Sequence, residues 1–180
     1  MVKKGIWIFV LILTVAGLWV MNIYPTQAEE NNVNYTLTDL NNRDFSYKDL
    51  HGTSFAGATM WDANFQGANL QKTILTKGDF LRANLKGADF TLTFADQVNF
   101  DNSDLTNAIL TDAMLMSSTF RNAKVTGTDF SGAIVDRYQT KLMCETASGK
   151  NPITKVETRN SLGCSCCLLY TSDAADEYSR

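Results

Sequence analysis

The chain has 180 residues, a formal net charge of −3 and a hydrophobic content of 44%. This length fits one domain, and the weak negative charge without a basic stripe argues against nucleic-acid binding. The sequence has one histidine, His51, and no nucleophile–histidine–acid set, metal-ligand cluster or phosphate loop, so we expect no catalytic, cofactor-binding or metal-binding residues.

Residues 1–28 have the composition of an export segment. Lys3 and Lys4 give a basic start, and the uncharged 17-residue run GIWIFVLILTVAGLWVM follows. Thr26 and Ala28 then supply small residues at positions −3 and −1 of a cleavage site. This order is typical of a secretory signal peptide cut after Ala28, in which case the protein meets a membrane only through this segment before cleavage. The alternative is an uncleaved membrane anchor, because the apolar run is nearly long enough to cross a bilayer.

From Asn31 to Val135 a large apolar residue returns at every fifth position. That position is Phe or Leu in 16 of 21 units, and a small residue stands two places before it in 17 of them. The residue between the two is Asp or Asn in 12 units. An α-helix would spread this apolar set over all its faces, and a flat strand would send alternate members to opposite sides. The period predicts a coil that bends once per unit and returns each fifth residue to one axis.

The units GANLQ, RANLK, GADFT and NSDLT resemble the A-(D/N)-L-x-x signature of the pentapeptide-repeat family. The resemblance covers Asn31 to about Val135 and implies an all-β solenoid over residues 29–135. Its implied form is a right-handed quadrilateral β-helix with four repeats per coil, about five coils in all, and residues 20 apart in register. Two internal columns would then contain Leu40, Met60, Phe80, Phe100 and Phe120, and Leu50, Leu70, Phe90, Leu110 and Phe130.

Two places depart from the pattern. Arg43 and Lys48 occupy inward small positions in the first coil, where their stems can leave through the open end of the solenoid. The unit TLTFA places Phe94 one residue early and puts Ala95 where a large residue belongs. This unit predicts a local bulge or an exposed Phe94, and the alternative is a binding spot built on Phe94.

After the repeats the five-residue period stops, and residues 136–166 have helical character instead. Asp136 is placed to cap a helix that runs to about Ala147. Thr154 and Glu157 have the spacing of a capping box for a second, shorter helix. Such a helical cap would cover the unpaired backbone groups of the last coil.

Cys144 and Cys164 flank this helical pair. The export segment would place them in an oxidising compartment, where a disulfide closing a loop of about 20 residues is favoured. A metal site and two free thiols are the alternatives, although the only histidine lies far off on the repeats. The stretch CETASGKNPITKVETRNSLGC also resembles the C-terminal cap of pentapeptide-repeat proteins of the cyanobacterial thylakoid lumen and of their chloroplast relatives.

Residues 167–180 fit neither pattern. The segment CLLYTSDAADE, from Cys167 to Glu177, resembles the translation of a transposase sequencing adapter. We therefore interpret the tail as an artefact that begins after Cys166 and exclude it from the fold. A natural disordered tail is the alternative.

The resemblance and the export segment together imply a non-catalytic structural or protein-interaction protein of the thylakoid lumen or periplasm, with an unknown protein partner. A second hypothesis is a DNA mimic, because some pentapeptide-repeat proteins imitate B-form DNA and bind DNA gyrase. The export segment and the weak charge count against this hypothesis, since gyrase is cytoplasmic. An enzyme is the third class, and no motif in the sequence supports it.

Overall fold

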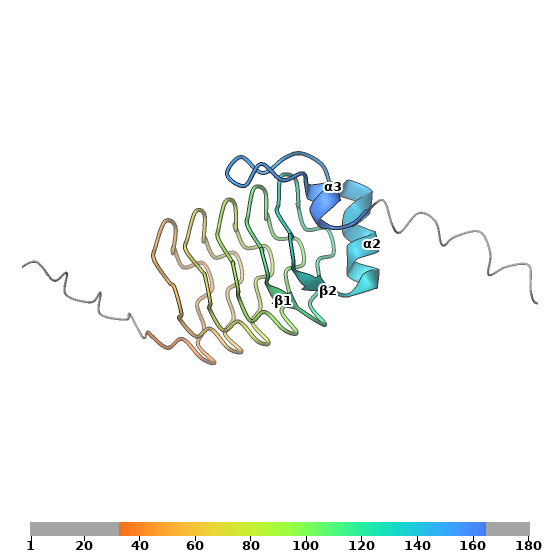
Figure 1. The fold of residues 1–180 in the computed structure, drawn as a ribbon. Helices are drawn as coiled ribbons and strands as arrows, with labels where there is room; N and C mark the ends of the chain where they lie inside the picture. The colour runs from red at the N-terminus through yellow and green to blue at the C-terminus, as the bar shows by residue number, and fades with distance from the viewer. Residues whose placement is uncertain (1–32, 165–180) are drawn as a thin grey trace, which may run out of the picture. The chain divides into compact units, whose positions relative to one another are not determined.

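The computed structural model describes residues 33–164. The expected signal peptide with its cleavage site at Ala28, and the expected artefactual tail 167–180, lie outside the described residues. Within the described part, the repeats wind into a solenoid whose coils stack side by side, and the helices lie at one end of the stack (Figure 1).

Each of the four sides of the solenoid is a column of parallel β-bridges between residues 20 apart. This spacing equals four five-residue units, so each residue lies above its counterpart in the neighbouring coil. On one side the pairing extends into a two-stranded parallel sheet of β1 (Met114–Leu115) and β2 (Ile134–Val135). The bridged residues of that side are Asn34, Ser54, Ile74, Phe94, Met114 and Ile134.

A tight turn with a left-handed residue forms each corner. In the first turn the N–H of Thr38 donates to the carbonyl of Tyr35, and Leu37 between them has a φ of 56°. This is the arrangement of a type II turn, in which glycine is the usual third residue. The same conformation returns every five residues as far as Gly132, at six glycines and 14 other residues. Glycine therefore marks only some of the corners.

Asp and Asn at the middle position of the unit support these corners. Asp79, for example, accepts a hydrogen bond from the backbone N–H of Leu81 at 3.1 Å. All 12 Asp and Asn residues at this position accept the N–H two residues further on, as in an Asx turn. Asn side chains at this position also bond along the stack, as Asn99 does when its amide donates to Asp79 at 2.8 Å. The middle position thus faces outward but has a structural role.

The fifth residue and the small residue of each unit point into the solenoid. The rings of Phe80, Phe100 and Phe120 stack with centroids 5.4 Å and 5.1 Å apart and are nearly parallel. Every member of the two internal columns is at most 8% exposed. Arg43 and Lys48, in the first coil, are exposed rather than enclosed in this core.

The unit TLTFA keeps the regular backbone of its neighbours. The N–H of Phe94 donates to the carbonyl of Thr73 at 3.0 Å, and that of Ala95 donates to Met114 at 2.8 Å. Ala95 points inward and is 1% exposed, whereas Phe94 is 52% exposed. The structure therefore shows an exposed Phe94 and no bulge.

Two helices follow the solenoid, α2 (Arg137–Thr146) and α3 (Thr158–Ser161). They lie against the last coil (Figure 1). Among residues 33–164, neither helix has the length and apolarity needed to cross a membrane.

The start of α2 closes the exposed end of the stack. Asp136 is the N-cap residue of α2, but its side chain makes no capping bond to the helix. Its Oδ2 instead accepts the N–H of Ser117 at 2.7 Å, and Oε1 of Gln139 accepts the N–H of Phe120 at 3.1 Å. These side chains satisfy N–H groups that in earlier coils bond to the next coil. The expected capping role of Asp136 is therefore wrong, although its position is right.

The expected capping box of Thr154 and Glu157 is also wrong. The shorter helix α3 begins after Glu157, which occupies its N-cap position without a side-chain bond. The reason lies in Asn151, whose Oδ1 accepts the N–H groups of Ile153 at 2.9 Å and Thr154 at 3.1 Å. Thr154 is thus held in a turn, so it cannot start a helix.

The segment between the two helices folds back over the solenoid (Figure 1). An antiparallel bridge joins Lys150 to Glu157. Asn151 is fully buried, and its Nδ2 donates to the carbonyls of Gly127 at 2.9 Å and Ala108 at 3.1 Å. The segment is therefore attached to the backbone of two successive coils.

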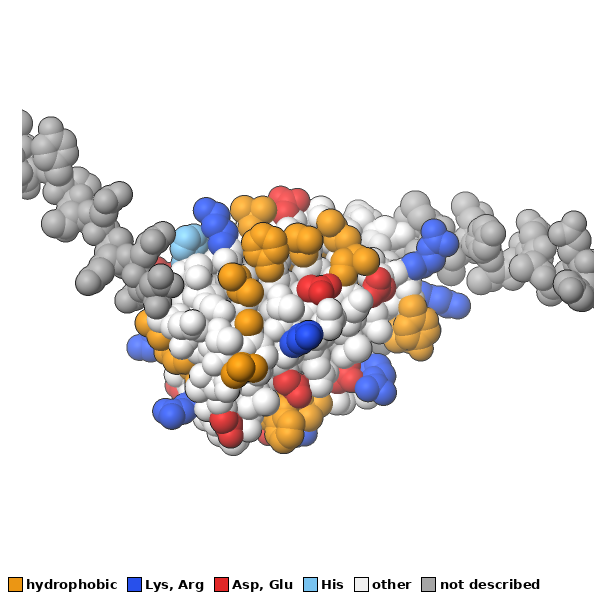
Figure 2. All heavy atoms as spheres, turned by 90° about the horizontal axis from the view of Figure 1, so that it is seen from below, with side chains coloured by type: hydrophobic (Ala, Val, Ile, Leu, Met, Phe, Trp, Pro, Cys, Tyr) orange, Lys and Arg blue, Asp and Glu red, His pale blue; other side chains and the backbone are white. Residues whose placement is uncertain are grey.

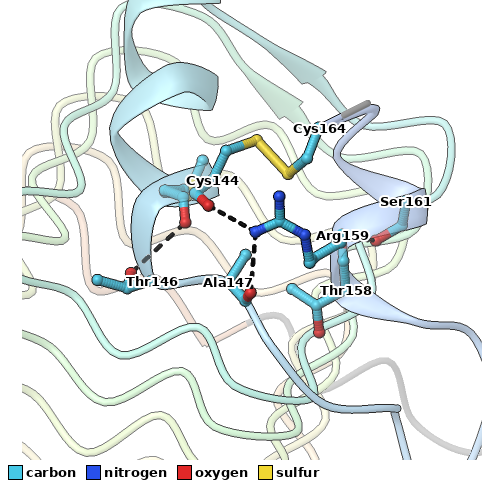
Figure 3. Close-up of a disulfide and its surroundings, with 8 residues drawn as sticks. Cys144, Thr146, Ala147, Thr158, Arg159, Ser161 and Cys164 are labelled. Carbon is cyan, nitrogen blue, oxygen red and sulfur yellow. Dashed lines mark hydrogen bonds between the residues drawn. A yellow bond between two sulfur atoms is a disulfide. The ribbon is translucent and has the colours of Figure 1, made fainter. Parts of the chain in front are cut away.

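Cys144 in α2 and Cys164 after α3 form a disulfide, with Cα atoms 5.6 Å apart (Figure 3). Arg159 lies beside it, and its Nη1 donates to the carbonyls of Cys144 at 2.8 Å and Ala147 at 3.4 Å. These carbonyls belong to the end of α2, where helical carbonyls lack a partner within the helix. The side chain of Arg159 thus caps α2 and ties it to α3.

Candidate interaction surface

The outward middle position distinguishes one side of the solenoid from the other three. The three polar sides carry Asp39, Thr59, Asp79, Asn99 and Thr119; Asp44, Asn64, Asn84, Asp104 and Lys124; and Asp49, Asn69, Asp89, Ile109 and Asp129. The remaining side carries four apolar residues in successive coils, Ile74, Phe94, Met114 and Ile134, which we call the apolar row.

The members of the apolar row are between 42% and 52% exposed. Leu92 and Met116 lie beside the row on opposite sides, two residues before Phe94 and two residues after Met114, and both are exposed. Together these are half of the 12 large exposed hydrophobic residues found in residues 33–164. Figure 2 shows hydrophobic side chains gathered in a row that crosses several coils, with acidic side chains beside it. A contiguous apolar patch of this kind marks an interaction site more often than a scattered set does.

The residues of the apolar row cannot make the hydrogen bond to a corner N–H that Asp and Asn make at the same position on the other sides. All Asp and Asn residues at the middle position accept a corner N–H, as Asp104 does from Thr106 at 3.1 Å. An apolar side chain cannot accept this bond, and a half-exposed one buries little surface in the core. Neither corner formation nor core packing therefore explains why four successive coils carry apolar residues on this side.

The charges around the row are unevenly distributed. Asp96, Asp112 and Asp136 lie two residues from Phe94, Met114 and Ile134 in the chain. None of the three makes an ion pair with another residue of the described part of the chain. At the other end, Lys72 and Lys77 flank Ile74, and both are exposed. Three members of the row thus have an Asp two residues away, and the N-terminal member has two Lys; the exposed Arg137 follows Asp136 at the C-terminal end.

On the other sides three carboxylates, Asp62, Asp101 and Asp104, make ion pairs. The remaining Asp residues of those sides accept corner N–H groups without a charged partner among residues 33–164. The guanidinium of Arg82 lies 2.6 Å from Asp62, and its hydrogen bonds hold the pKa of that carboxyl below the ordinary value. Asp101 forms an ion pair with Arg121, in which the charged atoms are 2.8 Å apart. These pairs join neighbouring coils, so they are explained by the stack itself.

A cleft of about 430 Å³ lies between the last coil and α2. Arg121, Lys124 and Glu145 contribute charges of both signs to its wall. His51 lies elsewhere, exposed on a corner, where its backbone N–H donates to Oδ1 of Asp49. Within residues 33–164 no group of three His, Cys, Asp or Glu residues is placed to hold a metal ion.

The sequence had singled out Phe94 but not its companions in the row. Ile74, Met114 and Ile134 are ordinary apolar residues when the chain is inspected in units of five. They form a row only when every fourth unit is compared, because the coil contains 20 residues. That longer period was the signal that would have identified them.

Comparison with known proteins supports the fold described above. A family model described as pentapeptide repeats matches residues 36–71, 63–100 and 96–132. The crystal structure of a pentapeptide repeat protein from the thylakoid lumen of Arabidopsis thaliana is similar, with a TM-score of 0.62, 32% identity and coverage of 72% of this chain and 90% of that chain. HetL, a pentapeptide repeat protein involved in heterocyst differentiation regulation in Nostoc, shares the fold with a TM-score of 0.56 and 24% identity, over 58% of this chain and 50% of that one.

A curated relative, the chloroplastic thylakoid lumenal protein TL20.3 of Arabidopsis thaliana, is 52% identical over 42 residues. The matched segment is 23% of this chain, and it spans only 15% of that relative. The family match covers more than half of the 180 residues, and the lumenal structure is matched over most of its length. The resemblance found in the sequence is thereby confirmed: this chain belongs to the pentapeptide-repeat family, whose solved members are right-handed quadrilateral β-helices.

Proposed function

We propose that this protein is a non-catalytic interaction protein, exported to the thylakoid lumen or the periplasm, that holds a protein partner on its apolar row. The observation that carries the proposal is the run of four half-exposed apolar residues at positions where the other sides carry mainly Asp, Asn or Thr. A regular solenoid offers binding surfaces along its sides, and a patch of this kind is the expected form of such a surface.

The ends of the solenoid are unsuited to binding further chains. The cap supplies side-chain acceptors to the last coil, as Asp136 does for Ser117. At the other end, Arg43 and Lys48 bring charges to the first coil, and charge on an open β-edge opposes stacking by other chains. With about five coils between these ends, the sides remain as the surface for a partner.

Export is supported by three independent features. Residues 1–28 have the order of a signal peptide. The disulfide of Cys144 and Cys164 is of the kind that persists in oxidising compartments. Two of the similar proteins are named for the thylakoid lumen.

The DNA-mimic hypothesis gains no support from the placement of charge. Acidic residues at the middle position are divided among three sides, as Asp79, Asp104 and Asp129 illustrate. A mimic of the DNA backbone needs its negative charge gathered along the binding face. Several of these carboxylates also accept hydrogen bonds from the corners.

The experiment is affinity capture from the lumen fraction of a photosynthetic host that expresses the tagged, full-length chain. The row variant carries Phe94→Ser and Met114→Ser, and the matched control carries Trp61→Ser and Tyr138→Ser, two exposed aromatics outside the row. We expect the wild type and the control to retain a protein that the row variant loses. Capture that is the same for all three, or recovery of the chain from the cytoplasm, would show the proposal to be wrong.

A further inference from the structure

We infer that the segment received by the apolar row is an amphipathic α-helix of about three turns, with one apolar residue per turn and basic residues beside that stripe. This inference rests on the proposed function, because it names the kind of partner that the same surface takes.

The backbone of the row decides that the partner is a helix. The N–H of Phe94 donates to Thr73 and its carbonyl accepts from Leu75, so both groups are used within the stack. Met114 is bonded in the same way, to Thr93 and from Ala95. A partner strand laid on this side would therefore find no free backbone groups to pair with. A helix satisfies its own N–H and C=O groups and needs only side-chain contacts.

The dimensions of the row agree with this choice. Neighbouring coils of a β-stack are separated by about 4.8 Å, so four members span about 14 Å. A helix advances about 5.4 Å per turn, so about three turns cover the row. One apolar residue per turn then lies opposite each coil, with a drift of only about 0.6 Å from one turn to the next. Leu92 and Met116 widen the middle of the row on both sides and would contact the flanks of the apolar stripe.

The same dimensions argue against a second copy of this chain. Stable dimers bury about 800 Å² on each partner. A row one residue wide and about 14 Å long supplies less than that, and the adjoining sides are polar. A membrane surface is also disfavoured, because insertion of the row into lipid would bring the carboxylates of Asp96, Asp112 and Asp136 towards an apolar phase.

The unpaired carboxylates determine the charge of the partner. Asp96, Asp112 and Asp136 make no ion pair within residues 33–164, so Lys or Arg beside the apolar stripe would find partners there. Lys72 and Lys77 give the opposite charge near Ile74. A helix has a positive N-terminal and a negative C-terminal end. We therefore expect its N-terminus near Ile134 and its C-terminus near Ile74.

The test uses synthetic peptides of about 14 residues as probes of the full-length chain. The first has one Leu per turn flanked by Lys, the second has the same Leu positions flanked by Glu, and the third is the first with its residues scrambled. Titration by fluorescence anisotropy gives the affinity, and circular dichroism reports helix formed on binding, because so short a peptide is mostly unfolded when free. We expect the first peptide to bind at least about tenfold more tightly than the others.

Protein variants locate the binding. We expect Phe94→Ser to weaken the first peptide at least about tenfold, and Trp61→Ser to leave its affinity unchanged. Asp96→Asn with Asp112→Asn is expected to remove most of the preference for Lys over Glu. These changes lie outside the core, so unfolding midpoints equal to the wild type confirm that each variant folds.

The outcomes separate this inference from the proposed function. If capture of the natural partner depends on Phe94 but the Lys-flanked peptide does not bind, or binds without forming helix, the helix is wrong and the function stands. If sedimentation finds a dimer that Phe94→Ser abolishes, the row binds a second copy of this chain and not a helix. If the chain binds vesicles containing anionic lipid and Phe94→Ser removes this binding, the row binds a membrane and not a helix. If capture does not depend on the row, the proposed function fails whatever the peptides do.

Discussion

The side-chain Nδ2 of Asn151 lies 2.9 Å from the carbonyl oxygen of Gly127, and this bond holds the segment between α2 and α3 against the solenoid. Asn151 is fully buried, and its Oδ1 also forms the turn that delays the start of α3. One residue therefore both shapes the cap and attaches it to the coils.

Replacing this residue should weaken the fold. Asn151→Ala removes the donor to the buried carbonyl of Gly127. The carbonyl of Ala108, by contrast, keeps the N–H of Asp129. A buried acceptor left without a donor costs about 1–3 kcal/mol in the free energy of unfolding. Asn160→Ala, at an exposed position in α3, is the control and should change it by less than about 0.5 kcal/mol. Urea unfolding of both variants measures the difference. Equal losses would mean that the cap is not held through Asn151.

Two phenylalanines should differ sharply in their contribution to stability. Phe100 is stacked between Phe80 and Phe120 in the core, so Phe100→Ala should lower the free energy of unfolding by about 3–5 kcal/mol. Phe94→Ala should change it by only about 0.5 kcal/mol, because the ring is half exposed. Urea unfolding again provides the measurement. If Phe94→Ala lowers the free energy of unfolding by a large amount, the apolar row stabilises the fold, and the reason to regard it as a binding surface is removed.

The disulfide should stabilise the cap measurably. Its loop spans 20 residues, and a cross-link of this length contributes about 2–4 kcal/mol. Replacing both cysteines, Cys144→Ser with Cys164→Ser, should lower the unfolding midpoint in a thermal scan. Reductant should lower the midpoint of the wild type and leave that of the double variant unchanged. A wild type that is insensitive to reductant would contradict the assigned role.

Acid should weaken the solenoid, in part through Asp104. Burial raises the pKa of Asp104, but hydrogen bonds from Thr106 and the charge of Lys86 outweigh this and hold it below the ordinary 3.8. A carboxyl with a lower pKa in the folded state stabilises the fold above its unfolded pKa, and that contribution is lost as the pH falls through the folded pKa.

We therefore expect the free energy of unfolding to decrease below about pH 4. The decrease should be smaller in Asp104→Asn, which cannot titrate at this position. Urea unfolding between about pH 7 and pH 3 tests this. An identical pH dependence in both proteins would show that Asp104 does not contribute.

Much of the fold could be predicted because each unit repeats the same physical requirement. Phe80, Phe100 and Phe120 recur where a narrow axis needs large apolar side chains, and Ala or Thr recurs where only a small one fits. The left-handed conformation of the corners was harder to predict from the sequence, because Leu37 and 13 other non-glycine residues adopt it there. The stack imposes that conformation through bonds between coils, so local residue preference does not report it.

The cap and the interaction surface depended on contacts that local patterns do not encode. Thr154 has the spacing of a capping residue, but the competing bond from Asn151 exists only because Asn151 is held on the solenoid. Arg159 caps α2 only once the two helices are side by side. The apolar row likewise requires the 20-residue register that aligns Ile74 with Phe94.

The most direct test of the central claim, that outward residues 20 apart lie side by side to form a row, is a cross-link. Phe94→Cys with Met114→Cys places two thiols on neighbouring coils, where Cα atoms about 4.8 Å apart lie within disulfide range. Phe94→Cys with Ala113→Cys is the control, because Ala113 points into the core. Mild oxidation followed by peptide mapping should find the bond from position 94 to position 114 and not the bond from 94 to 113. A cross-link in the control, or none in the first variant, would contradict the register and with it the apolar row.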